Sequence, residues 1–71
     1  MSTDRRMPDT LTGQLRWHIK HSGVSTYRIE QDTGVYSASL SRFLRGERGL
    51  SLEHIDTLGK YLGLRVVRAT D

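Results

Sequence analysis

A short stretch of the chain carries hydroxyl, methyl and guanidinium groups at the spacing of one helix face. These groups belong to Ser37, Ala38, Ser41, Arg42 and Arg45. Arginine offers a planar fork of donors that matches phosphate oxygens and the O6 and N7 atoms of guanine. Leu40, Phe43 and Leu44 recur at i, i+3 and i+4 and predict an apolar stripe on the opposite face. A helix with these two faces is shaped to enter a DNA major groove.

A helix, a corner and a second helix are expected to position this face. Ser25 is a good N-cap residue, and residues 27–33 are long enough for two helical turns. Gly34 then supplies a residue that tolerates positive φ, which a sharp corner between helices often needs. The helix that carries the polar face follows over residues 37–45.

The run from residue 24 to residue 46 resembles the helix-turn-helix of the phage-repressor or Cro-like family, also called XRE-type regulators. The residues that carry the resemblance are Ser25, Ile29, Gly34, Val35, Leu40, Phe43, Arg45 and Gly46. It extends outwards to Leu11 and Leu15 on one side and to residues 51–53 and 62–64 on the other. The resemblance implies an all-α fold, a compact four- to five-helix repressor-like bundle that contains the motif, and binding to double-stranded DNA.

The resemblance also indicates where DNA would be contacted. In the family, residues at the start of the second motif helix and one turn later reach base edges. The corresponding residues here are Ser37, Ala38, Ser41 and Arg42. Phosphate contacts are expected from Thr26, Tyr36, Arg45 and Arg48, with Arg16 and Lys20 as more distant candidates. Many members have glutamine or arginine in place of Ser37, so specificity is expected to rest on Arg42, dimer spacing and DNA shape.

Two departures from the family pattern affect how the motif helices are held. The family often has a small residue where Glu30 stands, so this carboxylate must turn to the edge of the helix pair or pair with Arg28 or Arg42. This departure could loosen the angle between the two helices. The family also often joins its first helix to the end of the second motif helix through an arginine–glutamate pair, at positions that here hold Ile19 and Leu44. Because packed apolar groups can replace a buried ion pair, we predict that Ile19 and Leu44 touch.

Three parts are expected along the chain. Residues 1–9 are predicted to be a flexible N-terminal arm, whose arginines either remain solvated or reach DNA. Residues 10–64 are expected to form the helix-turn-helix DNA-binding domain. Its first helix runs from residue 9 or 10 to residue 21, and its last helix begins after the cap Ser51 and ends at Gly63. Leu11 and Leu52 open the apolar faces predicted for these two helices.

Residues 65–71 are predicted to be a short C-terminal β-strand or an extended tail. Arg65 and Arg68 bracket two β-branched valines, a composition that favours a strand. A single strand is not stable alone, so a strand here would pair with the same strand of a second copy and give a homodimer.

Composition narrows the remaining function classes. The 71 residues carry a net charge of +3 and no cysteine. This charge suits a nucleic-acid partner without requiring one, and disulfides and cysteine-based zinc sites are excluded. His18, His21 and His54 are not matched by a carboxylate cluster, so no metal or cofactor is expected. No stretch is long and apolar enough to span a membrane and no secretory signal is present, so a cytoplasmic, nucleoid-associated protein is expected.

The leading hypothesis is a DNA-binding transcriptional regulator that acts as a repressor. Two alternatives stay open. The first is an antitoxin, which would bind DNA and also mask a toxin protein, and which the short length and the C-terminal tail allow. The second is a protein-interaction module that has lost DNA binding. It is suggested by Ser37 and Ala38, whose side chains can discriminate only weakly between bases. An enzyme is not expected, because no nucleophile–base pair, phosphate-cradling glycine loop or metal set is present.

Overall fold

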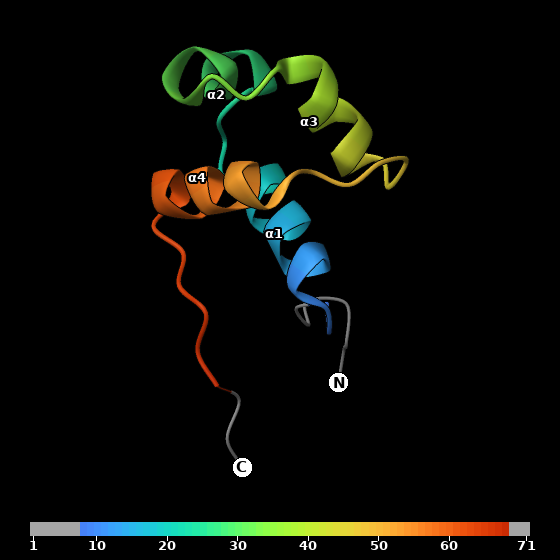
Figure 1. Cartoon of the computed structure of the whole chain (residues 1–71), viewed down its shortest axis with the longest axis vertical. Coiled ribbons are helices and arrows are strands. Elements are labelled where there is room, and N and C mark those ends of the chain that lie inside the picture. Colours follow the sequence, from blue (N-terminus) through green and yellow to red (C-terminus); the bar gives the residue numbers. More distant parts are fainter. Residues whose placement is uncertain (1–7, 69–71) are drawn as a thin grey trace.

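The polar face predicted from the sequence lies on the third of four helices. The structure is a computed structural model and describes residues 8–68. In chain order the helices are α1 (Leu11–Lys20), α2 (Thr26–Thr33), α3 (Ser37–Leu44) and α4 (Leu52–Leu62). Figure 1 shows α2 and α3 together at one end of the molecule, above α4 and α1. The fold is all-α, and its described part contains four helices and no strand.

Side-chain caps start three of the four helices. The side-chain oxygens of Thr10, Ser25 and Ser51 accept hydrogen bonds from the backbone N–H groups of the third helical residues of α1, α2 and α4. Each cap satisfies a donor that has no partner inside its helix. The predicted starts of these helices are therefore confirmed to within a residue.

Gly34 makes the corner between α2 and α3. Its φ of 84° lies in the left-handed region, and its N–H donates to the carbonyl of Glu30 at 2.8 Å. A side chain at this position would be strained, because L-residues with a Cβ rarely adopt this conformation. The predicted corner is confirmed.

A single apolar core holds α3 against the other helices. Its buried residues are Leu15, Ile19, Ile29, Val35, Leu40, Phe43 and Leu58. Leu40 and Phe43 are 0% and 1% exposed, so the apolar stripe of α3 faces inwards as predicted. Burial of each such side chain contributes about 1.5–3 kcal/mol. Leu44 is partly buried and packs against this cluster, to which Ile19 also belongs.

The apolar faces of α1 and α4 do not reach the core at their first residues. Leu11 is 65% exposed and Leu52 is 79% exposed, so their predicted place in the core is wrong. Each is the first residue of its helix, and this end of the helix lies outside the buried cluster. Both line a groove of about 650 Å³ between α1, α4 and residues 64–67.

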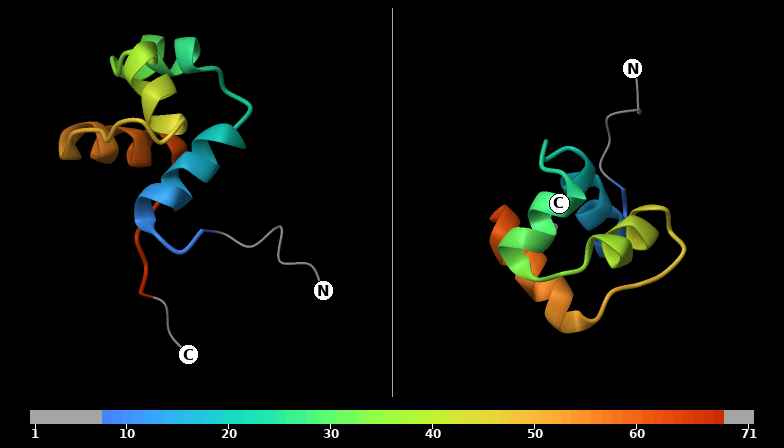
Figure 2. Two further views of the ribbon diagram at one scale, coloured as in Figure 1. Left: turned by 90° about the vertical axis from the view of Figure 1, so that its right-hand side faces the viewer. Right: turned by 90° about the horizontal axis from the view of Figure 1, so that it is seen from above.

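Residues 65–68 continue beyond Leu64, which packs against the core, without regular structure. They carry neither helix nor strand, and the backbone groups of residues 65–68 make no hydrogen bond to the rest of the described chain. The strand expected at residues 65–71 is therefore not formed within residues 65–68 of a single copy, since the described part of the chain contains no strand with which it could pair. Figures 1 and 2 show that this segment runs away from α2 and α3, and that the start of α1 lies toward the same end of the molecule. Residues 1–7 and 69–71, which include the expected arm, lie outside the described part.

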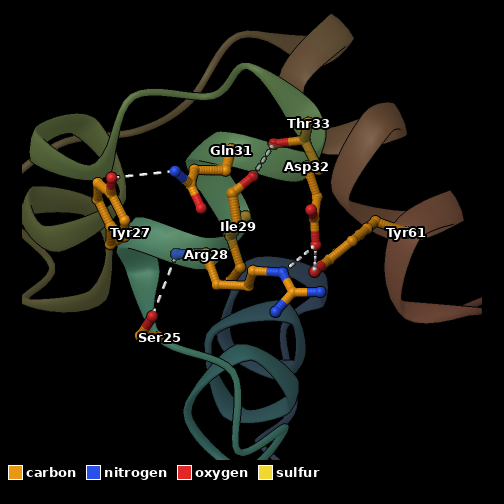
Figure 3. A network of polar contacts seen from close by, with 8 residues as sticks. All are labelled: Ser25, Tyr27, Arg28, Ile29, Gln31, Asp32, Thr33 and Tyr61. Carbon is orange, nitrogen blue, oxygen red and sulfur yellow. Dashed lines mark hydrogen bonds and ion pairs between the residues drawn. The ribbon is translucent and has the colours of Figure 1, made fainter.

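A polar cluster ties α2 to α4 (Figure 3). The hydroxyl of Tyr61 on α4 donates to Asp32 Oδ2, and the Nε of Arg28 donates to the same oxygen at 3.0 Å. The Tyr61 hydroxyl, followed by Arg28, lowers the pKa of Asp32 below its ordinary value of 3.8. The Asp32 carboxylate raises the pKa of Tyr61 above its ordinary value of 10.0.

This cluster predicts a loss of stability at both ends of the pH range. Because the pKa of folded Asp32 is lowered, its contribution is present above the unfolded pKa and is lost as pH falls through the folded pKa. Because the pKa of folded Tyr61 is raised, its contribution is complete below the unfolded pKa and is lost as pH rises through the folded pKa. We expect Asp32→Asn to flatten both limbs of a plot of melting temperature against pH. We expect Tyr61→Phe to flatten the alkaline limb and also part of the acid limb, because the Tyr61 hydroxyl is the largest cause of the lowered pKa of Asp32.

Thermal unfolding followed by circular dichroism across the pH range checks this prediction. Asp56→Asn is the matched control, because it removes a carboxylate of α4 that makes no side-chain hydrogen bond or ion pair within the described residues. A flattening by Asp56→Asn equal to that by Asp32→Asn would contradict the role of the cluster.

Candidate nucleic-acid interface

The outer face of α3 presents one methyl group and one guanidinium to solvent. Ala38 and Arg42 are exposed, whereas Leu40 and Phe43 on the inner face are buried. The Arg42 side chain makes no ion pair with any residue in the described range 8–68. It can therefore bind a ligand without first breaking an ion pair within the described residues.

The two serines predicted to touch bases lie at the flanks of this face. Ser37 and Ser41 are each half-buried. As whole residues they are less exposed than Ala38 and Arg42. The four predicted base-contact residues therefore lie on one helix, but only Ala38 and Arg42 are exposed on its outer face.

The start of α3 is held by a residue of α2. Tyr36 occupies the N-cap position and makes no side-chain cap hydrogen bond. Instead, Glu30 Oε1 accepts the N–H of Ser37 at 2.9 Å. The two arginines proposed as partners of Glu30 do not pair with it: Arg28 pairs with Asp32, and Arg42 makes no ion pair within the described residues. The expected loosening of the helix pair is therefore replaced by a cap that joins α2 to α3.

The end of α3 is held by a residue of α1. The Nε of Arg16 donates to the carbonyl of Phe43 at 2.8 Å, and its guanidinium carbon lies 4.9 Å from the centre of the Phe43 ring. A cation at this end of a helix also stabilises the helix dipole. Arg16 is thus held by the protein itself, although the sequence suggested it as a distant phosphate contact. It connects α1 to the end of α3 in a chain that lacks the family's arginine–glutamate pair.

The residues predicted to contact phosphate differ in how free their side chains are. Tyr36 is 68% exposed, Arg48 is exposed in the loop after α3, and Thr26 is half-buried at the first turn of α2. Arg45 is engaged with Glu47 through two hydrogen bonds of 2.8 and 3.2 Å. This pairing raises the pKa of Arg45 and lowers that of Glu47. Arg45 must therefore share or give up its carboxylate partner to bind a phosphate.

Glu47→Gln is expected to tighten binding to any duplex. The change frees Arg45 and removes a negative charge near the exposed face of α3, so affinity should rise by about two- to fivefold at low salt. Arg45→Ala should then weaken binding more in the Glu47→Gln protein than in the original one. Fluorescence anisotropy with a labelled duplex measures the affinity of the original protein, of the two single variants and of the double variant.

Asp56→Asn controls for net charge, because Asp56 lies on α4 in the groove beside residues 64–67. If it raised affinity as much as Glu47→Gln does, the gain would reflect net charge alone and the Arg45–Glu47 pair would have no part in it.

The arrangement of two helices joined by a glycine corner, with one face of the second helix exposed, agrees with a comparison of the chain with known protein families. A family model described as a Cro/C1-type HTH DNA-binding domain matches residues 14–66. The chain belongs to this family. The match takes in most of α1 and all of α2, α3 and α4 of the Cro/C1-type domain. No curated protein and no solved structure gives a significant match to the chain.

Family membership establishes the general function of this Cro/C1-type domain and confirms the resemblance drawn from the sequence. It is a helix-turn-helix DNA-binding domain of the kind found in regulators, with α2 and α3 as its two motif helices. Two contacts that hold α3, from Glu30 and Arg16, were not predicted from the sequence. Within residues 8–68 no three histidine, aspartate or glutamate side chains gather as metal ligands, and no helix has the length and apolar character needed to cross a bilayer.

Proposed function

We propose that this protein is a sequence-preferring transcriptional regulator that represses by occupying DNA with α3 in the major groove. The observation that supports the proposal most directly is that α3 has one buried face and one exposed face. Leu40 and Phe43 on the apolar face are 0–1% exposed, whereas Arg42 is exposed on the other face. The core thus fixes the helix while the reading side chains stay accessible. Bound near a promoter, the domain would exclude polymerase from the site it covers.

The proposed base contacts differ in how much sequence information each can carry. Arg42 would bind guanine through O6 and N7, and Ala38 would meet a thymine methyl. Ser37 and Ser41, at the half-buried flanks of α3, would add weaker hydrogen bonds. We therefore expect one strongly specified guanine and weaker preferences around it.

The proposed phosphate contacts surround α3. Thr26 and the backbone N–H groups at the start of α2 would hold one phosphate group, and Tyr36 would hold another from the corner. Arg48 would provide a cationic contact from the loop after α3, and Arg45 a further one shared with Glu47. These contacts would set the position of α3 without specifying bases.

A selection from random duplexes at low salt tests this function. We expect enrichment of a motif that contains one dominant guanine, and binding that weakens steeply as salt rises. Recovery of no motif, together with no binding to any duplex at low salt, would refute the proposal and favour an interaction module that has lost DNA binding.

A homodimer through the tail is proposed with a specific geometric consequence. Antiparallel pairing of the C-terminal segment that begins at Arg65 would relate two copies by a two-fold axis perpendicular to the tails. Because the tail points away from α2 and α3 (Figures 1 and 2), this rotation would place the two α3 helices at opposite ends of the dimer. Such a dimer would hold two separate DNA segments instead of two adjacent half-sites of one operator. The selected motif should accordingly be short and without two-fold symmetry.

An antitoxin remains the second candidate, and the groove beside the tail favours it. Leu11, Leu52, Val66 and Val67 are all at least 65% exposed, and all four line this groove. An apolar segment of a toxin could lie there while α3 stays on DNA. The test is whether a gene adjacent to this one arrests growth when expressed alone and whether co-expression of this protein restores growth.

A further inference from the structure

We propose that Glu30 is a positioning and specificity-determining residue of the DNA-reading helix. Its carboxylate fixes the first backbone donor of α3, and its negative charge lies at the helix end that would approach DNA. These two roles have opposite effects on binding, because the first favours the correct register and the second repels a polyanion. The inference rests on the proposed function, which it deepens.

Glu30 closes one motif helix and starts the next. Its backbone carbonyl accepts the N–H of Gly34 at 2.8 Å, and its carboxylate accepts the N–H of Ser37 at 2.9 Å. The two bonds lie on either side of the corner, whose φ at Gly34 is 84°. The first bond ends α2, and the second links α2 to the start of α3, so one residue takes part in both.

No other group of the helix performs this role. Tyr36 makes no side-chain cap, and the first turn of α3 contains no acidic residue. A negative charge near a helix N-terminus interacts favourably with the helix dipole, and a hydrogen bond between a carboxylate and a backbone N–H is stronger than a neutral one. Glu30, which is half-buried and makes no ion pair within the described residues, supplies both effects from a neighbouring helix.

The position of this contact connects it to sequence reading. Ser37 is the first residue of α3, and Ala38 follows it on the exposed side. A shift of the helix start would move both groups relative to base edges, whereas phosphate contacts from the loop would be little affected. Because the carboxylate already accepts the Ser37 N–H, this donor is not available to a DNA phosphate. Glu30 therefore favours discrimination between sequences at the expense of affinity for all of them.

Two substitutions separate the hydrogen bond from the charge. Glu30→Gln keeps an oxygen that can accept the Ser37 N–H but removes the charge, and Glu30→Ala removes both. Asp56→Asn is the matched control, since it removes one negative charge at the groove beside the tail. Circular dichroism first establishes that each variant is folded at the temperature of measurement.

The readouts are the hydrogen exchange of the Ser37 amide in the free protein and binding to the selected duplex and a scrambled duplex. We expect Glu30→Gln to tighten binding to both duplexes by about two- to fivefold, the scale of one charge near a helix end. We expect Glu30→Ala to lower the ratio of specific to non-specific affinity by about three- to tenfold, the scale of one hydrogen bond. Exchange at Ser37 should be markedly faster in Glu30→Ala than in the original protein and close to the original in Glu30→Gln.

Distinct outcomes overturn distinct parts of the inference. Unchanged Ser37 exchange in Glu30→Ala would refute the cap. If the ratio of specific to non-specific affinity were equal in Glu30→Ala and Glu30→Gln, the role of Glu30 in positioning α3 would be refuted. Glu30 would then contribute only to stability. If the original protein bound no duplex, the proposed function and the DNA role of Glu30 would fail together, while the exchange measurement would still decide whether the cap exists.

Discussion

Phe43→Ala is expected to destabilise the protein by about 3–5 kcal/mol, the cost of truncating a fully buried aromatic ring. Phe43 is 1% exposed, lies among the largest buried side chains, and has the Arg16 guanidinium over its ring. A domain of this size has limited stability in reserve, so the variant should be largely unfolded at physiological temperature. Urea denaturation followed by circular dichroism measures the change.

Tyr27→Ala is the matched control for Phe43→Ala. Tyr27 is also aromatic but is 64% exposed on α2, where its hydroxyl accepts a hydrogen bond from Gln31 (Figure 3). Its loss should have a small effect on stability, since surface substitutions usually change stability by about 0.5 kcal/mol or less. Equal destabilisation by the two substitutions would contradict the inward orientation of the apolar face of α3.

Arg42→Ala is expected to reduce discrimination at one base pair by about 1–3 kcal/mol while leaving the fold intact. Arg42 is exposed and makes no ion pair within the described residues, so its removal breaks no ion pair that holds the helices together. Binding should be measured with the selected duplex and with duplexes in which each base pair is replaced in turn. The preference should vanish at the dominant guanine and persist elsewhere.

Arg48→Ala provides the contrasting result. Arg48 is exposed in the loop after α3 and is proposed to bind phosphate, so its loss should weaken binding to all duplexes alike and make the salt dependence shallower. A uniform loss from Arg42→Ala, with every base preference retained, would show that Arg42 is a phosphate contact and not a reading residue.

The helices and their order could be predicted because each start or corner depends on a local signal. Ser25 and Ser51 cap the helices that follow them, and Gly34 takes the positive φ that its position predicted. The inward face of α3 followed from the spacing of Leu40 and Phe43. Caps and periodicity act over a few residues, so they are visible in a single sequence.

The contacts that hold the ends of α3 could not be predicted in the same way. Arg16 binds a carbonyl 27 residues away, and Glu30 binds an N–H across a corner. Both are bonds from a side chain to the backbone of another helix, and such bonds leave no periodic trace in the sequence. The sequence suggested an arginine partner for Glu30 and a DNA phosphate for Arg16, whereas in the structure each of them binds an uncharged peptide group.

The positions of Leu11 and Leu52 show a different limit. Periodicity assigns a residue to a helix face, but it does not tell how far along that face the core extends. Both residues lie on the expected faces at helix starts, beyond the buried cluster and beside residues 64–67. A sequence pattern alone therefore overestimates the core at the outer ends of α1 and α4.

The support of α3 from two other helices limits what can be transplanted. A synthetic peptide with the sequence of residues 36–46 would lack the Glu30 carboxylate that binds the start of α3 and the Arg16 guanidinium that binds its end. In addition, a helix of eight residues is only marginally stable alone in water. Moving the side chains of Ala38 and Arg42 into another scaffold would reproduce the reading face only if the host supplied equivalents of Glu30 and Arg16. The reading face of α3 is therefore a property of the whole bundle, in which α1 and α2 hold the ends of α3 and Leu58 of α4 completes the core beneath it.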